Sequence, residues 1–183
     1  MKRFAIATAV LAGLLTAGFA VGTHADAFVF ISPIVGSNPG LSIAGVASGG
    51  APWTVRHGVV VLDDNGGLNA DVRGLLLPST GTTGPVTQVA AVVVCTGGTG
   101  PAVAATSKSV NLSSKGNAKI HDKVTVPSPC FAPIVLIRAS GINNTPTAAG
   151  PFIALTGTAK EANDNDAQDN DNNDGHGHEL NDN

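Results

Sequence analysis

The side chains between residues 28 and 159 that could do acid–base chemistry are two histidines and four aspartates: His57, His121, Asp63, Asp64, Asp71 and Asp122. A hydrolase needs a base within reach of a nucleophile and of an orienting acid. The adjacent pair His121-Asp122 has suitable residue types, but strand neighbours point to opposite faces and no G-x-S-x-G motif is present. Asp63 and Asp64 lie in a turn-forming segment. We therefore expect no catalytic residue, and a secreted hydrolase that uses His57 or His121 with an aspartate is the alternative.

Cys95 and Cys130 are the only cysteines of the chain. Neither belongs to a C-x-x-C pair and neither has a histidine nearby, so a metal site or a reactive thiol is the weaker interpretation. We expect a structural disulfide between them. Closing a loop of about 35 residues would stabilise the fold by about 3–4 kcal/mol on the chain-entropy model.

The segment 160–183 holds eight acidic residues and one lysine, and it is otherwise mostly asparagine, glycine and histidine. It has too little apolar surface to offset the entropy of ordering, so we expect a disordered tail that favours solubility. A second interpretation is weak binding of zinc, nickel or copper. Its candidate ligands are Asp174, His176, His178 and Glu179.

We expect no cofactor and no nucleic-acid partner. The glycine-rich stretches 45–50 and 96–100 lack the Lys-Ser/Thr pair of a phosphate loop. Residues 28–159 carry seven Lys/Arg against four Asp, which is too weak an excess for a nucleic-acid footprint. The single tryptophan, Trp53, begins an apolar run, and we expect it in the core rather than on a sugar-binding face.

The elements that must position these residues are short strands. Composition favours them, with 23 Gly, 11 Pro and 4% aromatic residues, and no window has helical periodicity. We expect one all-β domain, an antiparallel β-sandwich of Ig-like or Greek-key type, with a barrel as the alternative. The continuously apolar runs Val89–Val94 and Pro133–Ile137 predict central strands buried on both faces. The nine expected strands are 28–34, 41–47, 53–62, 68–77, 86–95, 102–112, 118–126, 134–139 and 152–156.

Asn65-Gly66 predicts a two-residue type I′ hairpin loop, because both residues tolerate positive φ. That register gathers apolar residues on one face, in the pairs Val55–Leu76, Val59–Val72 and Val61–Ala70. His57 then falls on this apolar face, opposite Gly74. The other face is mixed, with Val60 opposite Asp71.

A second hairpin is expected around residues 113–116, between a strand ending at Leu112 and one starting at Ala118. The second of these strands alternates, with Ala118, Ile120, Val124 and Val126 inward and Lys119, His121 and Lys123 outward. Asp122 interrupts the apolar face and marks either a bulge or a sheet edge.

The start of the chain has the three parts of a bacterial-type signal peptide. Met1-Lys2-Arg3 is positive, residues 4–22 are uncharged, and Ala25-Asp26-Ala27 offers a cleavage site. We expect cleavage after residue 27, with an uncleaved membrane anchor as the alternative. The mature chain should then be soluble, without a membrane partner, in the extracellular or periplasmic space, where disulfides form.

The expected organisation is therefore a signal peptide (1–27), a β-sandwich domain (28–159) and a tail (160–183). Because no catalytic set is found, we expect a non-catalytic secreted protein that acts as a binding or envelope-associated module. Its unknown extracellular or envelope partner would be met through loops or an exposed sheet edge.

Overall fold

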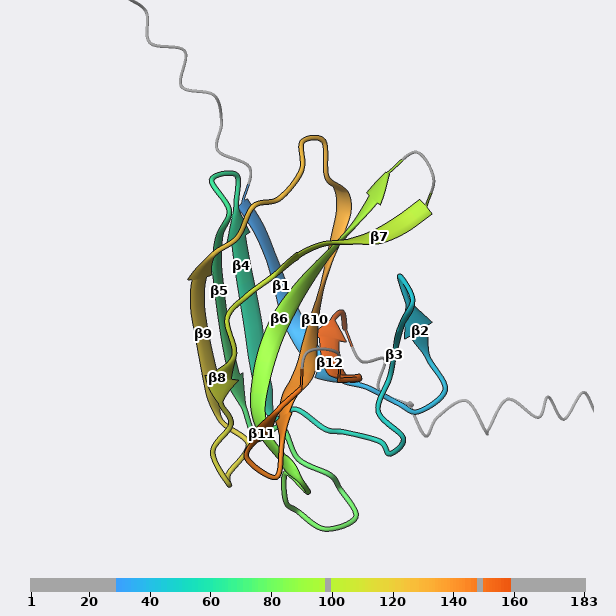
Figure 1. Ribbon diagram of the computed structural model, residues 1–183, viewed down its shortest axis with the longest axis vertical. Helices are drawn as coiled ribbons and strands as arrows, with labels where there is room; N and C mark the ends of the chain where they lie inside the picture. Colours follow the sequence, from blue (N-terminus) through green and yellow to red (C-terminus); the bar gives the residue numbers. More distant parts are fainter. Residues whose placement is uncertain (1–28, 98–99, 148–149, 159–183) are drawn as a thin grey trace, which may run out of the picture.

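Every element of the computed structural model is a β-strand within residues 29–97, 100–147 and 150–158, which are the residues that the structure describes (Figure 1). No helix in this part of the chain could cross a bilayer. The predicted signal peptide and acidic tail lie outside these residues. The strands are β1 (Val29–Gly36), β2 (Ser42–Ile43), β3 (Val46–Ala47), β4 (His57–Asp63), β5 (Gly67–Arg73), β6 (Val86–Gly97), β7 (Gly100–Thr106), β8 (Val110–Asn111), β9 (Ala118–Lys123), β10 (Phe131–Ile142), β11 (Thr145–Pro146) and β12 (Phe152–Thr156).

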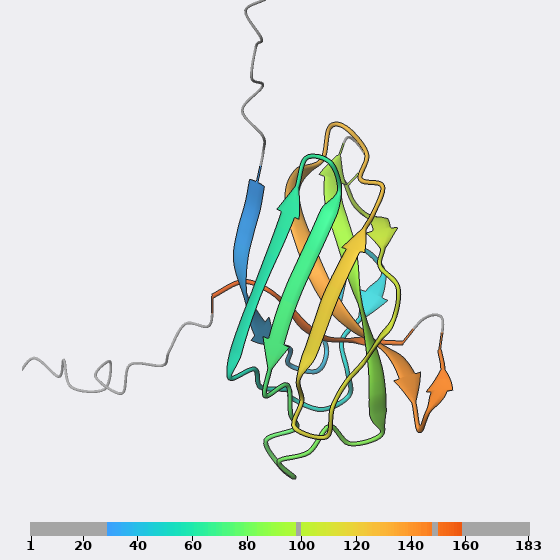
Figure 2. The same ribbon diagram turned by 90° about the vertical axis from the view of Figure 1, so that its left-hand side faces the viewer.

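One antiparallel 10-stranded sheet, in the order β7-β6-β10-β12-β1-β4-β5-β9, forms most of the domain. β8 adds to β6 and β11 adds to β10, while β2 and β3 make a separate small ribbon. β1 joins two halves, since Val29–Pro33 pair with β4 and Ile34–Gly36 pair with β12. The sheet curls, so that the half containing β4, β5 and β9 faces the half containing β6 and β10 (Figures 1 and 2). The all-β prediction is confirmed, and the two layers of the expected sandwich belong to a single curled sheet.

The main core lies between these two halves. Val60, Leu68 and Val72 meet Val93 and Ile137 within one buried cluster. Trp53 belongs to the same cluster and is 7% exposed, which agrees with the prediction that it is a core residue.

A second, smaller cluster covers the other face of β6 and β10. The alternate residues Val92, Val94 and Leu136 pack there with Phe152 of β12 and with Val46 of the β2–β3 ribbon. This covering explains why the two apolar runs are buried on both faces, as their sequences predict.

The β4–β5 hairpin has a register one residue away from the predicted one, so that Val60 pairs with Ala70 and Gly58 with Val72. Its loop has three residues and ends at Gly66, whose φ of 80° is typical of a type I turn followed by a bulge. The predicted inner residues Val59 and Val61 therefore face outward, and Val60 and Leu62 are buried instead. The burial of Ala70 and Val72 was predicted correctly.

The side chain of Asp63 explains the longer loop. Its Oδ1 accepts the N–H groups of Asn65 and Gly67 at 2.9 and 2.7 Å. A type I′ turn has positive φ at both central residues and occurs elsewhere, at Ala44-Gly45, with φ of 51° and 76°. That turn joins β2 to β3 and divides the strand expected over 41–47.

The prediction that the strands before and after residues 113–116 pair as a hairpin is wrong. β8 pairs with β6, and β9 pairs with β5, so the turn carries the chain between the two halves. The alternation along β9 is confirmed, since Ala118 and Ile120 are buried while Lys119 and His121 are exposed. Asp122 lies on this last strand of the sheet, in a β5–β9 pairing of unbroken register, so it marks an edge and not a bulge.

Cys95, near the end of β6, and Cys130, just before β10, form the expected disulfide with a Cα–Cα distance of 5.1 Å. Phe131 and Thr96 pair beside it. The bond thus joins two neighbouring strands and encloses β7, β8 and β9 in its loop.

Candidate functional site

The two histidines considered for catalysis lie apart on the outer surface. His57 pairs with Arg73 at the start of β4 and is exposed, so its predicted place on an apolar face is wrong. The one-residue shift of the hairpin is the cause. His121 is also exposed, and its Nδ1 contacts the Oδ1 atom of Asn69 on β5.

Asp122, the sequence neighbour of His121, takes part in a different set of contacts. Its two carboxylate oxygens accept the backbone N–H groups of Lys108 and Lys123 at 2.7 and 2.9 Å. These hydrogen bonds hold the pKa of Asp122 below its usual value. The hydrogen bonds of the described residues thus join neither histidine to a serine or a carboxylate.

The predicted metal ligands Asp174, His176, His178 and Glu179 lie outside the described residues. Within 29–97, 100–147 and 150–158, no three His, Cys, Asp or Glu side chains gather closely enough to hold a metal ion.

Positive charge is concentrated on one half of the sheet. Of the seven Lys/Arg in the described residues, Arg138 alone lies on the opposite half, where its Nε donates to the carbonyl of Gly150 at 2.7 Å. Of the other six, Arg73 lies on β5, Lys119 and Lys123 lie on β9, and Arg56 and Lys115 lie shortly before β4 and β9. The sixth, Lys108, lies between β7 and β8, where its N–H donates to Asp122 of β9. The pleat directs Arg73, Lys119 and Lys123 outward, because their neighbours Val72, Ala118 and Val124 are buried.

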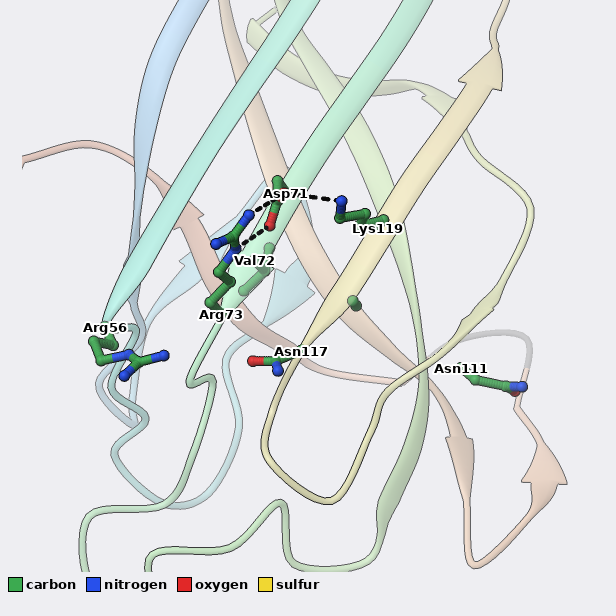
Figure 3. A pocket seen from close by; sticks show the side chains of 8 residues that line it. Arg56, Asp71, Val72, Arg73, Asn111, Asn117 and Lys119 are labelled. Carbon is green, nitrogen blue, oxygen red and sulfur yellow. Dashed lines mark hydrogen bonds and ion pairs between the residues drawn. The ribbon is translucent and has the colours of Figure 1, made fainter.

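Four of these side chains, Arg56, Arg73, Lys115 and Lys119, border two adjoining surface hollows and are here called the basic face. The hollows have volumes of about 430 and 510 Å³, and Arg56 and Asn117 line both. Figure 3 shows Arg56 and Arg73 on one side of the first hollow and Lys119 on the other.

Asp71 is the single carboxylate that borders these hollows, and it positions two of the cations. Arg73 donates to both of its oxygens, with Nε–Oδ1 at 3.1 Å and Nη2–Oδ2 at 3.2 Å. Lys119 Nζ lies 3.7 Å from Oδ2. The hydrogen bond from Arg73 is the main reason that the pKa of Asp71 lies below its usual value, so this group stays ionised well into the acid range.

Most polar groups of the first hollow that remain free to bind a ligand are hydrogen-bond donors. The oxygens of Asp71 are engaged by Arg73, and the Asn117 carboxamide oxygen accepts the N–H of Gly74 at 3.1 Å. What remains for a ligand is guanidinium, ammonium and amide N–H. Such a surface can bind carboxylate or phosphate groups, and it holds no acid–base pair.

Sequence reasoning missed this surface because it counted charges over the whole domain. The outward alternation of Lys119, His121 and Lys123 was visible in the sequence. The pairing of β5 with β9 was not visible, because the two strands lie far apart in the sequence. The hydrogen bond from the N–H of Gly74 to Asn117, for example, joins residues 43 positions apart. No protein-family model, curated protein or solved structure matches this chain.

Proposed function

We propose that this protein is an exported, non-catalytic binding module that holds an anionic polymer of the cell envelope on its basic face. The observation that carries the proposal is the gathering of Arg56, Arg73, Lys115 and Lys119 around donor-rich hollows. The disulfide between Cys95 and Cys130 supports a place outside the cytoplasm, where such bonds persist.

The shape of the basic face favours a polymer over a small molecule. The side chains of Arg73 and Lys119 are 52% and 78% exposed, so a ligand there stays in contact with water. Exposed ion pairs are individually weak and screened by salt. Useful affinity therefore requires several phosphate or carboxylate groups that contact the face together, as a polyphosphate or polyuronate chain provides.

Fluorescence anisotropy with labelled polyphosphate and with labelled polygalacturonate tests the proposal and separates phosphate from carboxylate recognition. Neutral dextran of similar size serves as the uncharged comparison. We expect binding of one or both polyanions that weakens steeply as salt rises from about 50 to about 200 mM, and no binding of dextran.

The decisive variant is Arg56→Gln with Lys115→Gln, which removes two cations of the basic face and leaves the Arg73–Asp71–Lys119 contacts intact. Its matched control is Lys108→Gln with Lys123→Gln, which removes the same charge beside the β9 edge but outside the basic face. We expect the Kd of the first variant to rise by about 5- to 30-fold and that of the control by less than about 3-fold. Equal losses in both variants would show general charge attraction and refute a defined binding face.

A further inference from the structure

We propose that the acidic segment 160–183 of the same chain docks on the basic face and competes there with an external polyanion. This inference rests on the basic face described above, but not on the identity of any outside ligand. The segment holds one lysine and eight acidic residues: Glu161, Asp164, Asp166, Asp169, Asp171, Asp174, Glu179 and Asp182. The face presents four cations and one carboxylate. The charges of the two are therefore complementary within a single molecule.

The last residues that the structure describes, just after β12, lie beside the half of the sheet that carries this face. The N–H of Gly157, just after β12, donates to the carbonyl of Pro33 in β1 at 3.0 Å. In Figure 2 the end of β12 emerges next to β1, at the margin of the surface formed by β4, β5 and β9.

The strand register gives the distance that the segment must cover. Pro33 pairs with Val59, Val59 with Asp71, and Asp71 with Lys119, so one row of residues runs from the end of β12 to the basic face. With the first step from Gly157 to Pro33 included, four interstrand steps of about 4.8 Å lead to Lys119 and amount to about 19 Å. Asp71 lies three of these steps from Gly157, about 14 Å, and Arg73 lies two residues farther along β5, which adds about 7 Å.

The acidic segment is long enough for this path. An extended chain advances about 3.3 Å per residue, so Asp164, seven residues after Gly157, can reach about 23 Å. Its first carboxylates can thus meet Lys119 and Arg73, and the later ones remain for Arg56 and Lys115. A segment tethered at this distance meets its site at an effective concentration of the order of millimolar.

The contacts would be exposed and salt-sensitive, so docking is reversible. At about 0.1 M salt the Debye length is about 10 Å, which leaves charges in direct contact effective but screens those farther away. An external polyanion of higher charge density would displace the segment. We expect the segment to weaken external binding by about 3- to 10-fold at low salt and to have no effect near about 0.5 M salt.

Two-dimensional ¹H–¹⁵N NMR on the full chain tests this docking directly. The comparison variant is the full chain with the eight acidic residues of 160–183 changed to their amides. We expect amide shifts of Arg56, Arg73, Lys115 and Lys119 to differ between the two proteins at about 20 mM salt and to converge near about 0.5 M. Residues of β7, on the opposite edge of the sheet, serve as the internal reference and should not shift.

Two further measurements make the outcomes distinct. Arg56→Gln with Lys115→Gln should reduce the salt-dependent shifts, whereas Lys108→Gln with Lys123→Gln should retain them. Shifts that grow with protein concentration would place the segment on a second copy and overturn docking within one chain. Basic-face spectra that are identical in wild type and in the amide variant would overturn the inference and leave the segment as a solubilising tail.

The polyphosphate titration separates this inference from the proposed function. If the amide variant binds labelled polyphosphate several-fold more tightly than wild type at low salt, both stand. If the spectra show docking but no variant binds either polyanion, the docking stands and the proposed function fails. If wild type and the amide variant bind equally and their spectra agree, the function stands and the docking fails.

Discussion

Loss of the bond between Cys95 and Cys130 should remove a large share of the stability of this domain. The bond connects β6 to the residue before β10, and its loop contains β7 and β8 from one half and β9 from the other. Without the disulfide, residues 95 and 130 can lie far apart in the unfolded chain, and folding must bring them together at a cost in conformational entropy. The destabilisation therefore arises mainly in the unfolded state.

The sequence separation sets the magnitude. For a separation of 35 residues, the chain-entropy relation gives a contribution of about 4 kcal/mol at room temperature. Small domains unfold with a total free energy of about 5–15 kcal/mol. With a urea dependence of about 1.5 kcal/mol per molar, the unfolding midpoint should fall by about 2–3 M.

Urea titration followed by tryptophan fluorescence provides the assay, because Trp53 is the only tryptophan and is 7% exposed in the folded domain. Two arms are compared with the oxidised wild type: the double variant Cys95→Ala with Cys130→Ala, and the wild type reduced by a phosphine. The reduced arm keeps both sulfur atoms, so agreement between the arms excludes a mere loss of packing. If both thiols titrate as free and the midpoint stays within about 0.5 M of the oxidised value, the reasoning is wrong.

Two further predictions concern the turn and the edge that shape the β4 half. Gly66→Ala should destabilise the domain by at least about 2 kcal/mol, because its Cβ would lie 1.9 Å from the carbonyl oxygen of Val124 at a φ of 80°. Gly40→Ala is the matched control with a φ of 82° and open space around the Cβ, and it should cost only about 1 kcal/mol in chemical denaturation; equal losses would refute the role of the clash. The hydrogen bonds that lower the pKa of Asp122 should stabilise the fold at pH values above about 3.9, the ordinary pKa of an aspartate. This contribution should disappear as the pH falls through the lower pKa of Asp122 in the folded state. The melting temperature of Asp122→Asn should therefore fall less than that of wild type between about pH 5 and pH 2.5, and parallel curves would contradict the assignment.

Local patterns were enough to predict the all-β class, the cysteine pairing and the doubly buried runs of β6 and β10. The alternation along β9 was also readable, because period-two burial is a property of one strand. The hairpin at Asn65-Gly66 was misplaced by one residue, because its loop length depends on hydrogen bonds that the side chain of Asp63 accepts and on contact with Val124. The latter contact comes from the residue just after β9, far along the chain.

The basic face could not be predicted for a similar reason. Its cations come from the approach to β4, from β5, from the turn after β8 and from β9. Only the pairing of β5 with β9 places Arg73 and Lys119 around Asp71. Local sequence gives the direction of each side chain from its strand, but it does not give the neighbour of that strand.

The position of β12 has a consequence for how the molecule is made. It is the last strand of the described residues, yet it lies between β10 and β1 in the sheet. A nascent chain that stops before Phe152 therefore lacks the strand that connects β10 to β1. The curled sheet can therefore close only after translation has passed Thr156, the end of β12.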